Sequence, residues 1–330
     1  MNVQLKEVIT PKELSVFIRF PHSLYKGNTC WVPPLTMDEL STLRKDKNPA
    51  FEFCDARYWL AYDPQGRVVG RIAAIINRRH VEKWNQPYVR FGWFDFIDDL
   101  SVSAALLKAV EEWAVQNGMT AVHGPLGFTD LDREGMLIEG FDELGTMASY
   151  YNHPYYPRHI EALGYSKDID WVEYEISVPS EPNETIARAA GIILKRNKLT
   201  VSFPRNKKEL VSHAKEIFQL IDDEYQHLYG VVPLTPRQVE GYIQAYLGFM
   251  NPAFIPLVFD EQHQLVAFGI TLPSLSRGLQ KSHGDLFPFG FIHLLNALRQ
   301  NERLDLYLVA VKSEYQGKGV NALLIDALSR

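Results

Sequence analysis

The chain has 330 residues, and its 34 lysines and arginines against 40 aspartates and glutamates give a formal net charge of −6 at pH 7. Hydrophobic residues make up 46% and aromatic residues 12% of the sequence, which excludes a largely disordered chain and predicts about two globular domains. The acidic balance argues against sequence-independent nucleic-acid binding, because such binding needs a dense basic face toward the phosphates.

Cysteine content and hydropathy predict a cytoplasmic protein without membrane insertion. Cys30 and Cys54 cannot build a disulfide framework and lack the CxxC spacing of a metal pair. No window approaches about 18 uninterrupted apolar residues, and residues 1–7 lack the apolar core of a signal peptide. His153 and His159 are six residues apart beside prolines, so we predict no metal site.

Two matches at nearly the same offset predict that the chain contains one fold twice. Lys12-Glu13-Leu14 opens an apolar helical pattern and recurs 196 residues later as Lys208-Glu209-Leu210. Residues 62–69 recur 197 residues later as residues 259–266, and each copy is a polar turn between runs rich in branched and aromatic residues. These runs predict two β-hairpins, 59–62 with 68–76 and 255–259 with 265–272.

The remaining elements of the two copies follow one order. In the first copy we predict strand 91–96, helix 105–110, strand 120–122, helix 156–163 and strand 171–176. In the second copy we predict helix 186–194, strand 200–203, strand 304–311 and helix 322–327. The second copy has no counterpart of the last three elements of the first. We therefore expect it to be cut short at Arg330; the alternative is that it borrows the missing strands. We also expect extra residues between 273 and 303.

Prolines mark the predicted boundary between the copies. Pro179 and Pro182, with polar residues between them, interrupt both helix and strand. We predict an N-terminal domain over 1–178, a linker over 179–183 in which Asn183 caps the next helix, and a C-terminal domain over 184–330.

A turn with two glycines joins strand 304–311 to the helix that follows it. Gly317 and Gly319 lie between these two elements. Glycines at such a junction let backbone N–H groups converge on an anion, and the N-terminus of the helix adds partial positive charge. We therefore predict a loop that binds a diphosphate; the alternative is a strand-to-helix turn without a ligand.

This loop resembles the pyrophosphate loop of the GNAT superfamily of acyl-CoA N-acyltransferases. The pattern of that loop is Gln or Arg, any two residues, Gly, any residue, and then Gly or Ala. The corresponding residues here are Gln316, Gly317, Lys318, Gly319 and Val320, and Asn321 departs from the pattern at its last position. Residues 153–165 resemble the closing helix and aromatic exit of the superfamily, and residues 124–165 are similar to a group of bacterial, largely uncharacterised GNAT-like proteins.

The resemblance implies a fold and a cosubstrate. The fold is α/β (α+β) with two tandem GNAT-like domains, each a mixed twisted sheet flanked by helices. Acetyl-CoA or another acyl-CoA would lie along the backbone of Val309, Ala310 and Val311, with its diphosphate at residues 316–321. In the first copy Asp98 and Asp99 replace the glycines, and each would repel a phosphate charge by about 1 kcal/mol in water. We expect the first copy to have lost its hold on the cosubstrate.

Polar side chains supply candidates for the chemistry of acyl transfer. Asp305 and Tyr307 lie on the polar face of strand 304–311, where Asp305 would be the base and Tyr307 an acid or a binding group. The alternative is that both are ordinary polar residues of a strand.

Six acidic residues lie within residues 130–143, with only Arg133 to oppose them. Glycines mark this stretch as a long loop, and long loops in compact domains are often functional. We predict that Asp130, Asp132 and Glu134 attract a cationic amine; the alternative is a solvated acidic loop.

Together these features predict an acyl-CoA-dependent N-acyltransferase that acts on a small-molecule or peptide amine, by direct attack of the amine on the thioester. One alternative is a non-catalytic protein that binds an acyl-CoA or another metabolite. The other is an aminoacyl transferase that resembles the peptidoglycan-bridge enzymes, whose charged-tRNA donor fits poorly with a net charge of −6.

Overall fold

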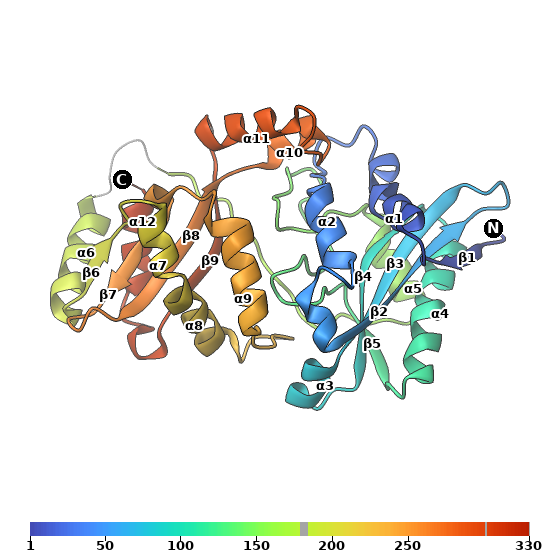
Figure 1. Cartoon of the computed structure of the whole chain (residues 1–330), viewed down its shortest axis with the longest axis horizontal. Coiled ribbons are helices and arrows are strands. Elements are labelled where there is room, and N and C mark those ends of the chain that lie inside the picture. Colours follow the sequence, from blue (N-terminus) through green and yellow to red (C-terminus); the bar gives the residue numbers. More distant parts are fainter. Residues whose placement is uncertain (179–183, 301, 330) are drawn as a thin grey trace. The chain divides into compact units, whose positions relative to one another are not determined.

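The computed structural model describes residues 1–178, 184–300 and 302–329, and these residues form two compact units (Figure 1). Unit 1 comprises residues 1–171 and 274–300. Unit 2 comprises the described residues between 172 and 273 and between 302 and 329. The predicted linker 179–183, with its cap Asn183, lies outside the described residues, and the predicted domain bounds stay a prediction.

Unit 1 is built on a five-stranded sheet whose strands follow chain order. They are β1 (Gln4–Glu7), β2 (Cys54–Tyr62), β3 (Val68–Asn77), β4 (Tyr88–Phe96) and β5 (Ala121–His123). The first four strands pair antiparallel, whereas β5 runs parallel to β4 because helix α4 (Leu100–Gln116) crosses over between them. The predicted first hairpin is β2–β3, and the predicted strands at 91–96 and 120–122 are confirmed as β4 and β5.

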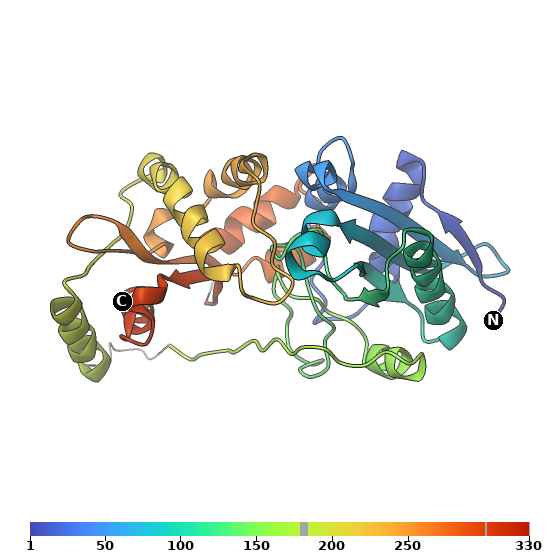
Figure 2. The ribbon, with the colours of Figure 1, turned by 90° about the horizontal axis from the view of Figure 1, so that it is seen from below.

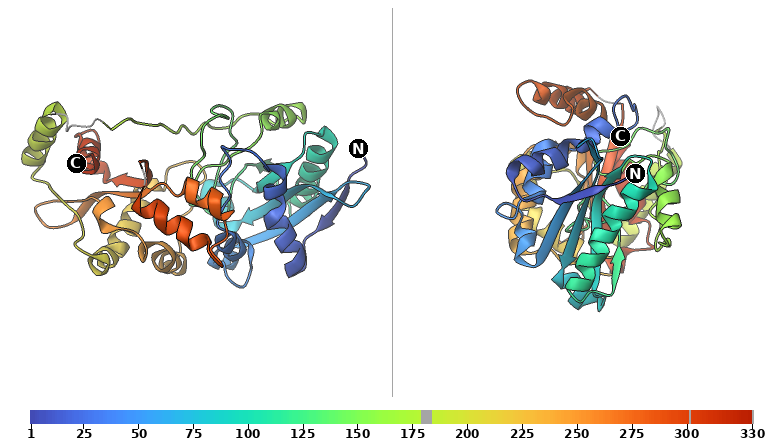
Figure 3. Two further views of the ribbon diagram at one scale, coloured as in Figure 1. Left: turned by 90° about the horizontal axis from the view of Figure 1, so that it is seen from above. Right: turned by 90° about the vertical axis from the view of Figure 1, so that its right-hand side faces the viewer.

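Helices cover both faces of this sheet. The helices of unit 1 are α1 (Pro11–Leu24), α2 (Thr36–Leu43), η1 (Pro49–Glu52), α3 (Arg78–Trp84), α4 (Leu100–Gln116), α5 (Tyr155–Ala162), α10 (Ser276–Ser282) and α11 (Gly290–Arg299). Phe17 and Ile18 of α1 are buried against one face of the sheet, and Val102 and Leu106 of α4 are buried against the other (Figure 3, right-hand view). A capping box between Thr10 and the N3 residue Glu13 starts α1 at the position that the sequence predicts.

The segment between β8 (Leu265–Pro273) and β9 (Leu304–Val311) forms a helical hairpin, α10–α11, that is part of unit 1. Arg19 of α1 forms a two-pronged ion pair with Asp285, at 2.8 and 2.9 Å. The Gln280 side chain donates to the carbonyls of Thr29 and Trp31, both at 2.9 Å. The extra residues predicted between 273 and 303 thus form two helices, which no sequence pattern indicates.

Unit 2 repeats the arrangement with four described strands in the order β6 (Thr200–Ser202), β7 (Leu257–Phe259), β8 (Leu265–Pro273) and β9 (Leu304–Val311), all antiparallel. Its helices are α6 (Glu184–Asn197), α7 (Lys207–Ser212), α8 (Ala214–Tyr225), α9 (Pro236–Tyr242), η2 (Ile243–Leu247), η3 (Pro252–Phe254), η4 (Ser313–Tyr315) and α12 (Val320–Leu328). Helices α6 and α12 pack on one face of the sheet and α8 lies on the other (Figure 2). Among the described residues, β9 is an edge strand of this sheet.

The two hairpin turns show the repeat at atomic detail. Asp63 Oδ1 accepts from the backbone N–H groups of residues 65 and 67, at 2.9 and 2.8 Å. Asp260 Oδ1 accepts from the N–H groups of residues 262 and 264, both at 2.9 Å. In each turn the residue three positions after the aspartate is left-handed, Gly66 at φ +76° and His263 at φ +56°. The predicted correspondence of the hairpins is therefore confirmed.

The predicted strand at 171–176 is wrong. Residues 171–178 have no regular secondary structure (Figure 2), and their side chains are exposed. The apolar side chains of Val172, Tyr174 and Ile176 alternate as in a strand, but a strand exists only where a neighbouring edge takes up its backbone hydrogen bonds. None of the described strands pairs with this segment.

We expect the buried ion pair of Arg71 and Asp95 to dominate the polar contribution to the stability of unit 1. Both side chains are about 5% exposed, and they lie 2.7 Å apart as neighbours on β3 and β4. Asp95→Ala leaves a buried guanidinium without its carboxylate, which should lower the free energy of unfolding by about 3–5 kcal/mol. All six tryptophans lie in unit 1, so tryptophan fluorescence during urea unfolding reports on this unit.

Two control variants separate burial from charge. Asp55→Ala removes an exposed ion pair with Arg78 and should cost no more than about 1 kcal/mol. The double variant Arg71→Met/Asp95→Leu removes both buried charges and should recover most of the lost stability. Equal effects of Asp95→Ala and Asp55→Ala would contradict this account.

Candidate functional site

Two backbone N–H groups at the outer edge of β9 have no partner among the described residues. Lys312 N donates to Val266 O, and in an antiparallel ladder this bond fixes which residues face β8. Ala310 therefore directs its backbone groups toward β8, whereas Val309 and Val311 direct theirs toward the free edge. Val309 O accepts from the Tyr225 hydroxyl and Val311 O from Gln316 Nε2, both at 2.9 Å. The two N–H groups have no acceptor within the described residues.

The loop after β9 continues this row of donors. Gly317 and Gly319 have left-handed backbones, with φ of +71° and +83°. Across residues 302–329, the N–H groups of Gly317, Gly319, Val320 and Asn321 also find no acceptor. The loop is exposed, and at Gly317 nothing lies within 4 Å of where a Cβ would be. Unpaired N–H groups at the start of α12 are the arrangement that binds a phosphate or another anion.

A single buried carboxylate holds the loop in this shape. Glu224 of α8 accepts from Ser313 N at 2.9 Å, from Ser313 Oγ at 2.6 Å and from Gln316 Nε2 at 3.1 Å. Gln316 thus braces the loop through its side chain, between Glu224 and Val311 O. Lys318 supplies positive charge beside the glycines, with Nζ 5.3 Å from the centre of the Tyr315 ring.

The candidate acid and base lie together on β9. The Tyr307 hydroxyl donates to Asp305 Oδ2 at 3.2 Å, and both side chains are half-buried. Tyr307 sits at a β-bulge, because the register passes from Ile270–Leu308 to Thr271–Leu306. The residues predicted for cosubstrate binding and catalysis thus all lie in unit 2, on β9 or in the loop and helix that follow it, and their roles stay a prediction.

Unit 1 has the same edge, but its own chain closes it. Ile97 N donates to Val69 O, so Phe96 occupies the ladder position that Val311 has in unit 2. The N–H of Phe96 donates to the Tyr156 hydroxyl at 3.0 Å, and its carbonyl accepts from the Tyr155 hydroxyl. Further along β4, the N–H of Trp93 donates to the hydroxyl of Tyr150 at 2.8 Å.

The strand-to-helix junction of unit 1 is likewise occupied. Asp99 Oδ1 caps α4 by accepting from Ser101 N at 2.8 Å. Asp98 Oδ1 lies 2.9 Å from His159 Nε2 of α5. Carboxylates thus stand where an anion would bind at the start of the helix. The loss of cosubstrate binding in this copy stays a prediction.

The acidic loop of unit 1 is more buried than the sequence indicates. Asp132 Oδ2 accepts from the N–H groups of residues 128 and 129, at 2.8 and 3.1 Å, while burial raises its pKa to about 6. Burial, and then the charge of Asp130, raise the pKa of Glu134 to about 8. The positive charge of Arg90 acts in the opposite direction and lowers the pKa of Glu134. At neutral pH the loop therefore carries less negative charge than its composition implies.

Two residues of this site are not among the predicted ones: Glu224, which binds the loop, and Tyr225, which binds the edge strand β9. A signal existed for Glu224, because it follows Ile217, Leu220 and Ile221 on the buried face of α8. A carboxylate on an apolar stripe needs buried donors, and here the loop supplies them. Nothing in the sequence distinguishes Tyr225 from an ordinary surface tyrosine.

Two kinds of site find no support in the described residues. None of the helices there is both long and apolar enough to cross a bilayer. Histidine, cysteine, aspartate and glutamate side chains do not gather there in groups of three or more that would hold a metal ion.

No family model matches the chain. It is 30% identical over 332 residues to Protein YghO of Escherichia coli K12, a match that covers 98% of this chain and 83% of that protein. It is 25% identical over 320 residues to a bacterial ceramide synthase of Caulobacter vibrioides, covering 94% of this chain and 80% of that protein. A solved structure described as a tandem GNAT protein from the clavulanic acid biosynthesis pathway, without AcCoA, aligns with 99% of this chain and 84% of its own at 12% identity and a TM-score of 0.49.

The topology of each unit agrees with the fold that the loop motif implies. Antiparallel strands lead through a fourth, bulged strand into a helix, and in unit 1 a fifth strand runs parallel to the fourth. The predicted fold class is confirmed. The chain therefore belongs to the family of Protein YghO.

Proposed function

We propose that this protein transfers an acyl group from an acyl-CoA to an amine, and that unit 2 holds the acyl-CoA. One observation carries the proposal: six backbone N–H groups between Val309 and Asn321, along the edge of β9 and the start of α12, have no acceptor in the part of the chain that the structure describes. The equivalent groups of Phe96 and Ser101 in unit 1 have acceptors. An extended ligand with an amide-rich arm and a diphosphate matches such a row.

The N–H groups of this row have two proposed roles, which are binding of the cosubstrate and activation of its thioester. The N–H groups of residues 317–321 would donate to the diphosphate, with Lys318 adding charge. The N–H groups of Val309 and Val311 would donate to the carbonyl oxygens of the extended arm and of the thioester. A donor fixed at a thioester oxygen stabilises the negative charge that develops there during attack, because it needs no reorganisation.

Asp305 and Tyr307 are proposed to handle the protons. A neutral amine attacks the thioester carbonyl, a C–N bond forms and the C–S bond breaks. Asp305 accepts the proton that the amine nitrogen loses, and Tyr307 donates a proton to the leaving sulfur. Their contact at 3.2 Å lets the two groups return to their starting states by exchange with each other and with water.

The relative named as a bacterial ceramide synthase refines the acceptor. A ceramide is the amide of a fatty acid and a long-chain amino alcohol, so its synthesis is N-acylation of an amine. We propose a long-chain amino alcohol as the first acceptor to test and a fatty acyl-CoA as the donor. Small polar amines and peptide amines are the other acceptors, acetyl-CoA is the other donor, and the bacterial cytoplasm is the expected location.

The direct test is release of CoA thiol from acetyl-CoA and from palmitoyl-CoA, with a long-chain amino alcohol, a polyamine or a peptide as acceptor. We expect amine-dependent thiol release together with the corresponding amide product. Binding of both acyl-CoA esters without any product would favour the non-catalytic alternative. A full-length chain that binds neither ester would contradict the proposal.

Adding a methyl group at Gly317 should weaken acyl-CoA binding. Gly317→Ala strains a left-handed backbone and places the methyl in the open space beside the unpaired N–H groups. We expect the Kd for palmitoyl-CoA, measured by titration calorimetry, to rise by about tenfold or more. Gly66→Ala is the matched control, since Gly66 has φ +76° and equally open surroundings in the first hairpin. Equal Kd values for the two variants would contradict a site at this loop.

Removing the proposed base should slow the chemical step and leave binding intact. Asp305→Asn keeps an acceptor for the Tyr307 hydroxyl but accepts no proton, so we expect kcat to fall by about 10²-fold or more while the Kd for acyl-CoA is unchanged. Glu314→Gln, an exposed acid on the same loop that pairs with Lys312, is the control. Unchanged kcat in Asp305→Asn and in Tyr307→Phe would remove both residues from the mechanism.

The proposal that Asp130, Asp132 and Glu134 attract the amine has a separate pH test. The folded-state pKa of Glu134 is raised to about 8 from an ordinary 4.5, so its contribution to stability is complete below pH 4.5 and is lost as the pH rises through 8. Relative to wild type, Glu134→Gln should therefore raise the free energy of unfolding of unit 1 more at pH 9 than at pH 5. The difference between the two pH values should be on the order of 1–3 kcal/mol for a partly exposed group.

Tryptophan fluorescence during urea unfolding at the two pH values measures this difference. Glu139→Gln is the control, because Glu139 is exposed on the same loop. If Glu134→Gln also raises KM for a cationic amine at low salt and pH 9, where the carboxyl is ionised, the residue serves the acceptor as well as the fold. A pH-independent difference between wild type and variant would show that Glu134 is not buried in its neutral form.

A further inference from the structure

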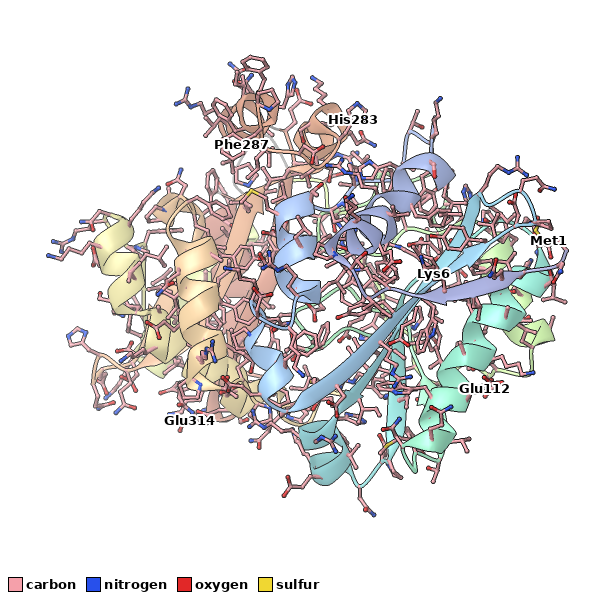
Figure 4. All side chains as sticks on the ribbon, turned by 45° about the vertical axis from the view of Figure 1, so that its right-hand side comes forward. Met1, Lys6, Glu112, His283, Phe287 and Glu314 are labelled. Atoms are coloured by element: carbon pink, nitrogen blue, oxygen red, sulfur yellow. The ribbon has the colours of Figure 1, made fainter. Side chains whose placement is uncertain are left out.

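The α10–α11 hairpin of unit 1 exposes an unusual amount of apolar surface. Phe287 and Phe289, in the turn between the helices, are 74% and 70% exposed. Phe291, Ile292 and Leu295 of α11 are each more than 40% exposed. Figure 4 shows the hairpin at the top of the view, with Phe287 and His283 labelled. Contiguous exposed apolar groups on this scale mark a surface that another body covers.

The helix α11 turns its apolar side outward. Its inner side is formed by Leu294, which is buried, and by His293 and Ala297, which lie against Gly278 of α10. At 100° per residue, the outer sector then holds the exposed side chains of the helix, and these are Phe291, Ile292, Leu295, Asn296 and Arg299. A surface helix normally buries its apolar stripe, and α11 instead presents it outward.

The hairpin holds these side chains on a fixed frame. The ion pair between Arg19 and Asp285 ties the turn to α1, and Thr36 N donates to Gly284 O at 2.9 Å. Gly290 packs so closely on Asp285 O that a Cβ would overlap it. Phe287 and Phe289 therefore project from an ordered turn, and presenting them costs little conformational entropy.

Charge distinguishes between the possible occupants of this face. Between residues 274 and 300 there are three basic residues, Arg277, Lys281 and Arg299, against one acid, Asp285, which Arg19 already neutralises. The hairpin is thus cationic in a chain of net charge −6. Two copies of such a hairpin would repel each other. An anionic lipid surface offers both an apolar phase for the aromatic rings and negative charge for the basic side chains.

We propose that the α10–α11 hairpin docks on an anionic lipid bilayer. Phe287, Phe289 and the outer sector of α11 enter the interface between headgroups and acyl chains, and Lys281 and Arg299 contact the headgroups. The hairpin lies on the bilayer and does not cross it. Docking itself is independent of acyl transfer; its use, delivery of a long-chain amine or release of an acylated one, rests on the proposed function.

Flotation of the full chain with vesicles tests the docking. We expect the wild-type chain to float with vesicles of phosphatidylethanolamine and phosphatidylglycerol, and to float less with pure phosphatidylcholine or at high salt. Phe287→Ser/Phe289→Ser should weaken binding by about tenfold or more, because two exposed rings no longer enter the interface. Ile9→Ser/Val115→Ser is the matched control, since these side chains are 81% and 75% exposed elsewhere in unit 1.

Each outcome has one meaning. No flotation of the wild-type chain, or equal flotation of the two double variants, overturns the proposal. A wild-type dimer that Phe287→Ser/Phe289→Ser converts to a monomer also overturns it and assigns the face to a second copy. Gly317→Ala should float normally while binding acyl-CoA poorly, so failure of docking and failure of the proposed function are distinguishable.

Discussion

The two units differ in whether the outward N–H groups of their fourth strand have hydrogen-bond acceptors. In each unit the fourth strand ends a series of antiparallel strands, and its outward N–H groups need acceptors because buried or partly buried donors are costly to leave unpaired. In unit 1 tyrosine hydroxyls from the segment after β5 supply those acceptors at Phe96 and Trp93. In unit 2 the described residues supply none at Val309 and Val311, so the edge remains available to an extended ligand.

The loop that follows each fourth strand reinforces the difference. Asp98 and Asp99 place negative charge at the start of α4, where the helix dipole and the local hydrogen bonds favour it. Gly317 and Gly319 leave the corresponding donors of α12 exposed, and Glu224 satisfies the polar groups that would otherwise collapse onto them. The buried carboxylate of Glu224 fixes the loop, and the N–H groups of the loop stay exposed. The loop therefore has its shape before any ligand binds, which lowers the entropy cost of binding.

Local sequence patterns predicted helices, strands and the glycine loop. What these patterns missed depends on contacts between residues that are far apart in the sequence. Strand 304–311 and both hairpins follow from alternating side chains and aspartate-centred turns, whose hydrogen bonds are local. The strand expected at 171–176 failed because alternation shows only that a segment suits a sheet, whereas a strand also needs an edge. Glu224 lies about 90 positions before the loop it holds, and no local pattern connects the two.

The hairpin α10–α11 extends the same reasoning from polar to apolar groups. The chain interrupts the second sheet between β8 and β9 to build it, and fixes its turn through Asp285 and Gly290. Selection for stability alone would bury Phe287 and Phe289 or replace them with polar residues, because exposed aromatic rings gain nothing from folding. Their presence on a rigid cationic support therefore calls for an apolar partner. A bilayer satisfies that demand, and it is also where an enzyme that acylates a long-chain amine would meet its acceptor.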